Sequence, residues 1–142
     1  MNKTALNNAH IELGAKMVNF SHWEMPISYT SLIEEHHAVI NTAGIFDVSH
    51  MSVFDFNGDD QVAFFEKIFA NDIKKISNQD KAIYGALLNE KGGILDDLII
   101  YHAKDKFRLV SNCSTREQNR QWYEKHAFEF GVRVVERSDM GI

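Results

Sequence analysis

Hydrophobic residues in the first 50 positions recur at the spacing of two short helices. Thr4 is placed to cap the first helix, and Gly14 is placed to end it. The second helix should begin at residues 31–34, which have the pattern of a capping box, and Gly44 should stop it. Residues 1–49 are therefore predicted to form a helical leader at the front of the chain.

Two shorter segments lie between these predicted helices. Residues 15–20 alternate between apolar and polar side chains as a short strand does. Residues 21–26 contain the only proline of the chain and are predicted to be an irregular loop. No internal repeat or low-complexity tract marks a domain boundary, so the boundary near residue 50 rests on the change of pattern alone.

The pattern beyond residue 50 alternates between strand and helix periodicity. The predicted strands lie at about 50–57, 82–88, 94–102, 107–110 and 132–135, and the predicted helices lie at about 59–70 and 114–130. A glycine-containing hairpin loop is predicted at residues 89–93. This order is that of a ferredoxin-like β-α-β-β-α-β unit with one extra hairpin strand. We expect an α+β fold in which residues 50–137 form that unit.

Asp96 and Asp97 interrupt an otherwise apolar strand, and successive strand residues point to opposite faces of a sheet. At least one carboxylate of the pair is therefore expected to be buried. A buried carboxylate needs donors or a cation, or it serves chemistry that requires a perturbed environment. The alternative is that both residues lie at the start of the strand and simply cap the hairpin beside residues 92–93.

Composition and charge narrow the classes of function. The 142 residues are 44% hydrophobic and carry a formal net charge of −5, which disfavours nucleic acid and anionic membranes as general partners. No apolar run approaches the roughly 20 residues that span a bilayer. The single cysteine, Cys113, cannot form an internal disulfide, which fits a reducing compartment. We therefore expect a cytoplasmic protein that binds a small molecule or another protein.

Three histidines raise the question of a metal site. His36 and His37 are adjacent on a predicted helix, where neighbouring side chains diverge by about 100°. His50 stands apart from them, and no second ligand pair occurs at i, i+4 spacing. The sequence therefore predicts no metal site.

Five segments occur in an order and spacing that resemble the T-protein family, the aminomethyltransferases of the glycine cleavage system. These segments are residues 13–18, 23–26, 44–51, 81–84 and 92–98. The blocks at 44–51 and 92–98 are the most specific. The Asp-Val-Ser-His-Met sequence within the first block is shared with folate-dependent demethylases and with non-catalytic folate-binding relatives. The two aspartates after the double glycine resemble the aminomethyltransferase branch.

The resemblance implies a three-domain, folate-binding enzyme in which tetrahydrofolate lies in a central channel. The family transfers the one-carbon unit of an aminomethyl group from the lipoyl arm of H-protein to tetrahydrofolate and releases ammonia. Carried over by position, Asp97 is the family's catalytic carboxylate. Met51, Tyr84, Asp97, Tyr101 and Asn112 match its folate-contacting positions.

The resemblance also implies that residues 138–142 begin a further part of the fold. On that view this 142-residue chain alone would be inactive, and its leader helices would be uncovered and free to self-associate. The alternative functions are a catalytically incompetent folate-binding module, a truncated fragment and a related folate-dependent demethylase. The sequence decides neither the oligomeric state nor the roles of Asp96 and Asp97 relative to each other.

Overall fold

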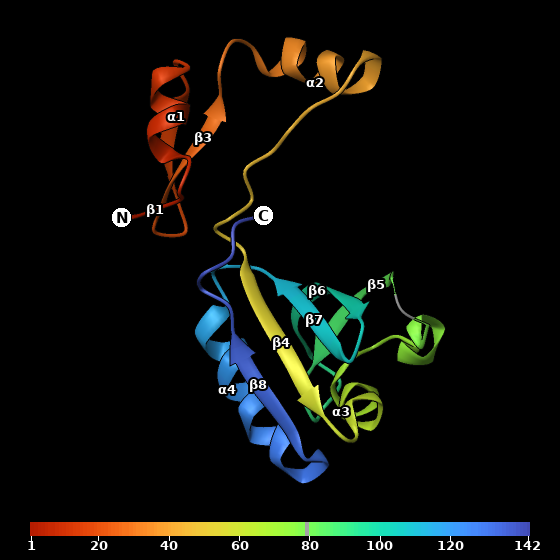
Figure 1. Cartoon of the computed structure of the whole chain (residues 1–142). Coiled ribbons are helices and arrows are strands. Elements are labelled where there is room, and N and C mark those ends of the chain that lie inside the picture. The colour runs from red at the N-terminus through yellow and green to blue at the C-terminus, as the bar shows by residue number, and fades with distance from the viewer. Residues whose placement is uncertain (79) are drawn as a thin grey trace. The chain divides into compact units, whose positions relative to one another are not determined.

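The computed structural model describes residues 1–78 and 80–142, which fall into two compact units. One unit contains residues 1–50 together with 141–142, and the other contains residues 51–140. Figure 1 shows the elements of each unit in the order of the chain.

The first unit combines two helices with a small three-stranded sheet. Its elements are β1 (Asn2–Lys3), α1 (Asn7–Glu12), β2 (Lys16–Phe20), β3 (Trp23–Ser28) and α2 (Leu32–Asn41). The sheet order is β1-β3-β2, with β3 antiparallel to β2 and parallel to β1. Both predicted helices and the predicted strand at 15–20 are present. Strands β1 and β3 were not predicted, so the leader contains more strand than the sequence pattern indicates.

The prediction of an irregular loop at residues 21–26 is wrong, because Trp23–Ser28 form the central strand of this sheet. The chain reverses at Ser21 and His22, both of which have positive φ angles. The strand accommodates Pro26 because β1 pairs only with Trp23 and Glu24. Pro26 pairs with Met17 of β2 on the other side.

The two leader helices begin differently. Ser31 caps α2 as predicted, since its side chain accepts a hydrogen bond from the backbone N–H of Glu34. Thr4 does not cap α1 with its side chain, because the helix begins later and Leu6 occupies the N-cap position. Thr4 contributes its backbone carbonyl, which accepts from the N–H of Asn7. Gly14 follows α1 with a φ of 78°, as a helix-ending glycine does.

A chain of three side chains ties distant parts of the first unit together. Nε2 of His10 in α1 lies 2.8 Å from the carboxylate of Asp47, and Nδ1 of the same ring lies 2.7 Å from the hydroxyl of Tyr29. Burial opposes ionisation of Asp47, but hydrogen bonds with Ser49 and His10 outweigh it and hold the Asp47 pKa well below its usual range.

The second unit is a five-stranded antiparallel sheet, and helices connect some of its strands along the chain. Its elements are β4 (Ser52–Gly58), α3 (Gln61–Ile68), η1 (Ile73–Ile76), β5 (Lys81–Leu88), β6 (Ile94–Ala103), β7 (Lys106–Ser111), α4 (Arg116–Ala127), η2 (Phe128–Phe130) and β8 (Val132–Glu136). The strand order is β5-β6-β7-β4-β8. Without β5, this is the ferredoxin-like arrangement, so β5 is the extra strand, and it lies at one edge.

The element ends follow the sequence pattern closely in this unit. Each of the five predicted strands is present, with ends no more than two residues from the prediction. Helix α3 is shorter than predicted and is capped by Asp60, whose side chain accepts from the N–H of Ala63. The predicted last helix ends as α-helix at Ala127, continues as the 3-10 turn η2, and stops at Gly131 with a φ of 62°.

One face of the sheet holds the hydrophobic core, and both helices contribute to it. Phe54 and Phe56 of β4 and Ile100 of β6 have no exposed surface. Tyr123 of α4 packs edge-on against both phenylalanines at ring-centroid distances of 5.3 Å. Because strand side chains alternate, the residues between these core positions point to the opposite, open face.

The open face carries charged side chains around Asp55 of β4, which is 3% exposed. Its carboxylate accepts from Lys106 at 2.8 Å, from Arg108 at 2.7 and 2.9 Å, and from Arg137 at 2.9 Å. Burial favours the neutral acid, but the three cations outweigh it and hold the Asp55 pKa well below its usual range. This cluster bridges β4, β7 and the segment after β8.

Candidate active site

Strand β6 places its two adjacent carboxylates on opposite faces of the sheet. Asp96 shares the core face with Leu98 and Ile100 and is 6% exposed. Asp97 shares the open face with Tyr101 and is exposed to solvent. The period of two is a local property of the strand, whereas the position of the helices decides which carboxylate is covered.

Two residues from neighbouring strands hold the carboxylate of Asp97. The hydroxyl of Tyr84 in β5 donates to Asp97 Oδ2 at 3.1 Å. The side-chain amide of Asn112, which directly follows β7, donates to Asp97 Oδ1 at 3.2 Å. The structure therefore brings together three of the five predicted folate-contacting residues. Each oxygen of Asp97 is held by a different side chain.

The buried Asp96 is surrounded by hydrogen-bond donors. Its Oδ1 accepts from Asn112 Nδ2 at 2.6 Å and from the backbone N–H of Asp97 at 2.9 Å. Its Oδ2 accepts from Thr115 Oγ1 at 2.6 Å and from Asn119 Nδ2 at 2.5 Å. Hydrogen bonds from four donors thus offset the free-energy cost of burying this carboxylate.

The alternative in which the two aspartates cap the hairpin is wrong. The hairpin loop is closed by Asn89, whose side-chain oxygen accepts from the N–H groups of Lys91 and Gly93 at 2.9 Å each. Asp96 and Asp97 are the third and fourth residues of β6 and lie beyond this turn. Their contacts run to β5, β7 and α4 instead.

The two remaining predicted residues extend the site along the open face. Tyr101 is 41% exposed and lies four residues from Asp97 on the same face, a span of about 13 Å along a strand. Met51 precedes β4 and is half-buried, and its carbonyl accepts from Arg116 at 3.2 Å. Since Ser52 pairs with Ser111 and Ser111 pairs with Leu98, Met51 lies at the end of the sheet that also carries Asn112 and Asp97.

The electrostatics of the site favour a ligand that donates hydrogen bonds. The pKa of Tyr84 is raised above its usual value, chiefly because its hydroxyl donates to Asp97 and the negative charge nearby opposes the phenolate. Asn112 turns its NH2 group toward two carboxylates, so its amide oxygen points away as an acceptor. A carboxylate, an amide oxygen and two exposed phenol rings can bind a flat molecule with N–H groups.

Thr115 and Asn119 were missed as site residues by the sequence analysis. The sequence of residues 114–117 also predicts a capping box with Ser114 as the N-cap residue. That prediction is wrong, because the N-cap of α4 is Thr115, which makes no side-chain cap hydrogen bond. Its hydroxyl donates to Asp96 instead. Asn119 is fully buried and lies one turn before Tyr123 on the buried side of α4. A polar residue on the side of the helix that faces the core is the signal that the sequence offers.

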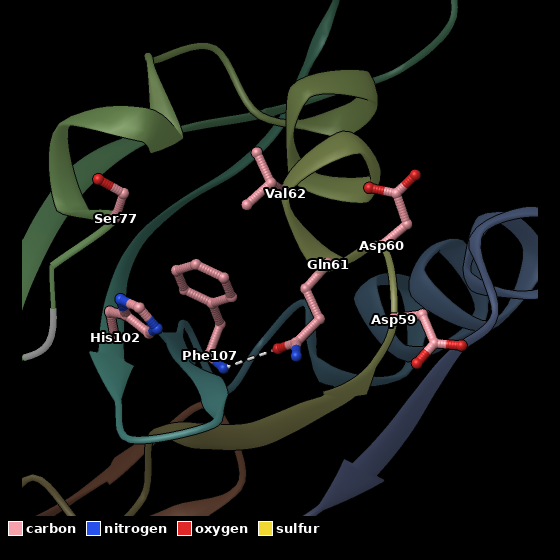
Figure 2. A pocket seen from close by; sticks show the side chains of 7 residues that line it. All are labelled: Asp59, Asp60, Gln61, Val62, Ser77, His102 and Phe107. Carbon is pink, nitrogen blue, oxygen red and sulfur yellow. Dashed lines mark hydrogen bonds between the residues drawn. The ribbon is translucent and has the colours of Figure 1, made fainter.

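A separate hollow of about 250 Å³ lies between the start of α3 and the β6–β7 hairpin. It is lined by Asp59, Asp60, Gln61, Val62, Ser77, His102 and Phe107, as Figure 2 shows. Its polar groups serve the fold: Gln61 accepts from the N–H of Phe107 at 3.0 Å, and His102 Nδ1 lies 2.8 Å from the carbonyl of Ile76. The predicted site residues do not line this hollow.

Within residues 1–78 and 80–142, no three His, Cys, Asp or Glu side chains are grouped to hold a metal ion. The same described residues contain no helix that is both long and apolar enough to cross a membrane.

Comparison with known proteins gives three consistent matches. Residues 6–141 match the family described as the GCVT N-terminal domain. An aminomethyltransferase of Stenotrophomonas maltophilia (strain R551-3) is 48% identical over 141 residues, which is 99% of this chain and 38% of that protein. The crystal structure of glycine cleavage system aminomethyltransferase T from Bartonella henselae superposes with a TM-score of 0.84 at 31% identity, over 96% of this chain and 38% of that one. The chain thus spans about two fifths of the length of these relatives.

Proposed function

The chain belongs to the family of the GCVT N-terminal domain, and from that premise we propose that it forms part of a tetrahydrofolate-dependent aminomethyltransferase of the glycine cleavage system. The observation that carries the proposal is the exposed carboxylate of Asp97, which Tyr84 and Asn112 hold on both oxygens. A carboxylate fixed in this way and open to solvent is suited to act on a ligand rather than to support the fold.

The residues present fit a reduced pterin. Its ring carries several N–H groups, and Asp97 and the amide oxygen of Asn112 are acceptors on one surface. The exposed rings of Tyr84 and Tyr101 offer flat apolar contact beside them. Tetrahydrofolate supplies the nucleophilic nitrogen that takes up the one-carbon unit. Met51, at the same end of the sheet, is proposed as a further contact.

Asp97 has the catalytic role in this proposal. Its carboxylate accepts a hydrogen bond from the attacking nitrogen and stabilises the positive charge that develops as the new C–N bond forms. Tyr84 and Asn112 orient the carboxylate, so little reorganisation is needed when the charge appears. The carbon would come from an aminomethyl group bonded to sulfur on the lipoyl arm of H-protein. Its bonds to the amino nitrogen and to the sulfur would be replaced by bonds to two folate nitrogens, with release of ammonia and of the lipoyl thiol.

The same geometry leads us to propose that residues 1–142 alone do not turn over. Asp97 and Tyr84 are exposed, so this part of the fold offers one wall of a site without the groups that would enclose a ligand. Poor positioning forfeits a contribution that reaches about 7–11 kcal/mol in well-oriented reactions. H-protein is the proposed macromolecular partner, and we place the protein in the cytoplasm, where the free thiol of Cys113 would stay reduced.

The test measures methylenetetrahydrofolate formation by the full-length protein with aminomethyl-loaded H-protein, and tetrahydrofolate binding by calorimetry. Asp97→Asn keeps the shape of the side chain and removes its charge. We expect kcat to fall by at least about 100-fold with little change in folate affinity. Binding without any turnover by the wild-type protein would identify a folate-binding module instead, and unchanged kcat in Asp97→Asn would remove Asp97 from the mechanism.

A further inference from the structure

The carboxylate of Asp96 divides its two oxygens between a helix and the candidate site. Oδ2 faces α4 and accepts from Thr115 at 2.6 Å and from Asn119 at 2.5 Å. Oδ1 faces the end of the sheet and accepts from Asn112 at 2.6 Å and from the N–H of Asp97 at 2.9 Å. Any shift of Asp96 toward or away from α4 therefore moves the acceptor to which Asn112 is bound.

The start of α4 departs from ordinary helix capping in favour of this contact. A threonine at the N-cap usually accepts from a backbone N–H of the first turn, but Thr115 donates its hydroxyl to Asp96. Asn119, one turn later, is fully buried, and its amide also lies 3.2 Å from Thr115 Oγ1. Local rules that are broken in this way concentrate at functional sites.

We propose that Asn119 and Thr115 are positioning residues for Asp97, acting through Asp96 and Asn112; this inference rests on the function proposed above. The link is the Asn112 amide, which bridges Asp96 Oδ1 and Asp97 Oδ1 at 2.6 and 3.2 Å. Asp97 is exposed, so packing does not fix its side chain. The direction of the Asp97 side chain depends on its hydrogen bonds with Asn112 and Tyr84. Helix α4 affects the position of Asn112, because both bind Asp96.

A purely structural role makes a different prediction. If Asp96 only fastens the sheet to α4, loss of a donor on α4 lowers stability but leaves Asn112 and Asp97 as they are. Thr115→Val removes one donor with almost no change in shape, and Asn119→Leu removes the other. The control is Ala127→Gly, which weakens the buried side of α4 two turns beyond Asn119 and leaves all four Asp96 donors in place.

The experiment records the side-chain amide resonances of Asn112 and the carboxyl carbon resonance of Asp97 by NMR, and measures kcat and KM for tetrahydrofolate in the full-length protein. We expect Thr115→Val and Asn119→Leu to shift both sets of resonances. We also expect them to lower kcat by about 10- to 100-fold, as small displacements of catalytic groups do, with a smaller change in KM. Ala127→Gly should lower stability and leave the resonances and kcat unchanged.

Reduced stability with unchanged Asn112 and Asp97 resonances would overturn the proposal and leave Asp96 as a structural tie. If Asn119→Leu does not fold, Asn119→Ala, which removes the same donor without a larger side chain, decides the question. Thr115→Val alone does not, because the Thr115 hydroxyl also donates to the carbonyl of Asn112 at 3.2 Å. If the wild-type protein shows no transfer activity, the proposed function fails, while the resonances still report whether α4 positions Asp97. Shifted resonances with an unchanged kcat would also overturn the proposal, because the orientation of Asp97 would not matter for the reaction.

Discussion

The hydroxyl of Tyr84 donates a hydrogen bond to Asp97 Oδ2 across the pair of strands β5 and β6, at a distance of 3.1 Å. The two residues are diagonal neighbours, because Tyr84 pairs in register with Ile99 and Asp97 pairs with Ala86. An aromatic side chain is long enough to reach a diagonal position on the same face. The extra edge strand of this fold thus supplies one of the two groups that orient the exposed carboxylate.

This contact should be visible in the titration of tyrosine. The hydrogen bond to Asp97 and its negative charge raise the pKa of Tyr84, so neutralising the carboxylate should lower that pKa toward the ordinary value of about 10. The measurement is the ultraviolet absorbance of phenolate against pH in the wild-type protein and in Asp97→Asn. The signal of Tyr84 is assigned from its loss in Tyr84→Phe. Superimposable curves for the wild-type protein and Asp97→Asn would show that the contact is absent in solution.

The two adjacent aspartates should differ sharply in their effect on stability. Asp96→Ala removes the acceptor that Asn112, Thr115 and the fully buried Asn119 share, which should lower the free energy of unfolding by about 2–4 kcal/mol. Asp97→Ala removes an exposed side chain and should cost about 0.5 kcal/mol. Chemical denaturation of both variants is the measurement. Equal losses would contradict the burial of only one carboxylate.

Asp55 should make the second unit sensitive to acid. Its pKa is held below its usual range in the folded state, so its contribution to stability is fully present above the unfolded pKa of about 4 and is lost as the pH falls toward the folded pKa. Unfolding measured between pH 2 and pH 7 should therefore show a steep loss of stability below about pH 4. Asp55→Asn should be less stable at pH 7, by about 1.5–3 kcal/mol, because it weakens charged hydrogen bonds, and it should have a flatter profile. A profile as steep as that of the wild-type protein would assign the acid sensitivity to other carboxylates.

Gly58 and Gly92 form a matched pair for testing backbone constraints. Both have positive φ angles, of 147° and 76°, but a Cβ on Gly58 would lie 2.3 Å from the carbonyl oxygen of Gly131, whereas a Cβ on Gly92 would meet nothing within 4 Å. Gly92→Ala should cost about 1–2 kcal/mol, the strain of the left-handed conformation. Gly58→Ala adds overpacking against backbone and should cost about 1–3 kcal/mol more. Similar melting temperatures for the two variants would contradict the close approach at Gly58.

Helix α2 should promote self-association of this chain. It has no buried residues, and Ile33 and Ile40 are 69% and 65% exposed on the stripe that the sequence marks as apolar. Replacing both residues by serine should lower the weight-average mass in sedimentation equilibrium toward that of the monomer. Glu34→Gln is a suitable control, because it changes the charge of the same helix and leaves the apolar stripe intact. An unchanged distribution in the serine variant would exclude this face.

Local features of this protein can be predicted from a few neighbouring residues. The period of two in residues 94–102 was enough to place Asp97 and Tyr101 on one face, and the structure confirms it. The helix-ending role of Gly131 and the cap at Ser31 were likewise readable, because each depends on a few neighbouring residues.

Which face of β6 is covered depends on packing between segments that are distant in the sequence. Asp96 is buried because α4 packs on its side of the sheet, and that packing joins residues about twenty positions apart. The same contact takes up the hydroxyl of Thr115, the N-cap residue of α4, which makes no side-chain cap hydrogen bond. Trp23–Ser28 became a strand for a similar reason, since its partners β1 and β2 satisfy its backbone hydrogen bonds. Contacts between segments outweigh local preference at these positions, because a buried polar group is costly unless a hydrogen-bond partner lies beside it. The positions of those partners are set by the packing of distant segments.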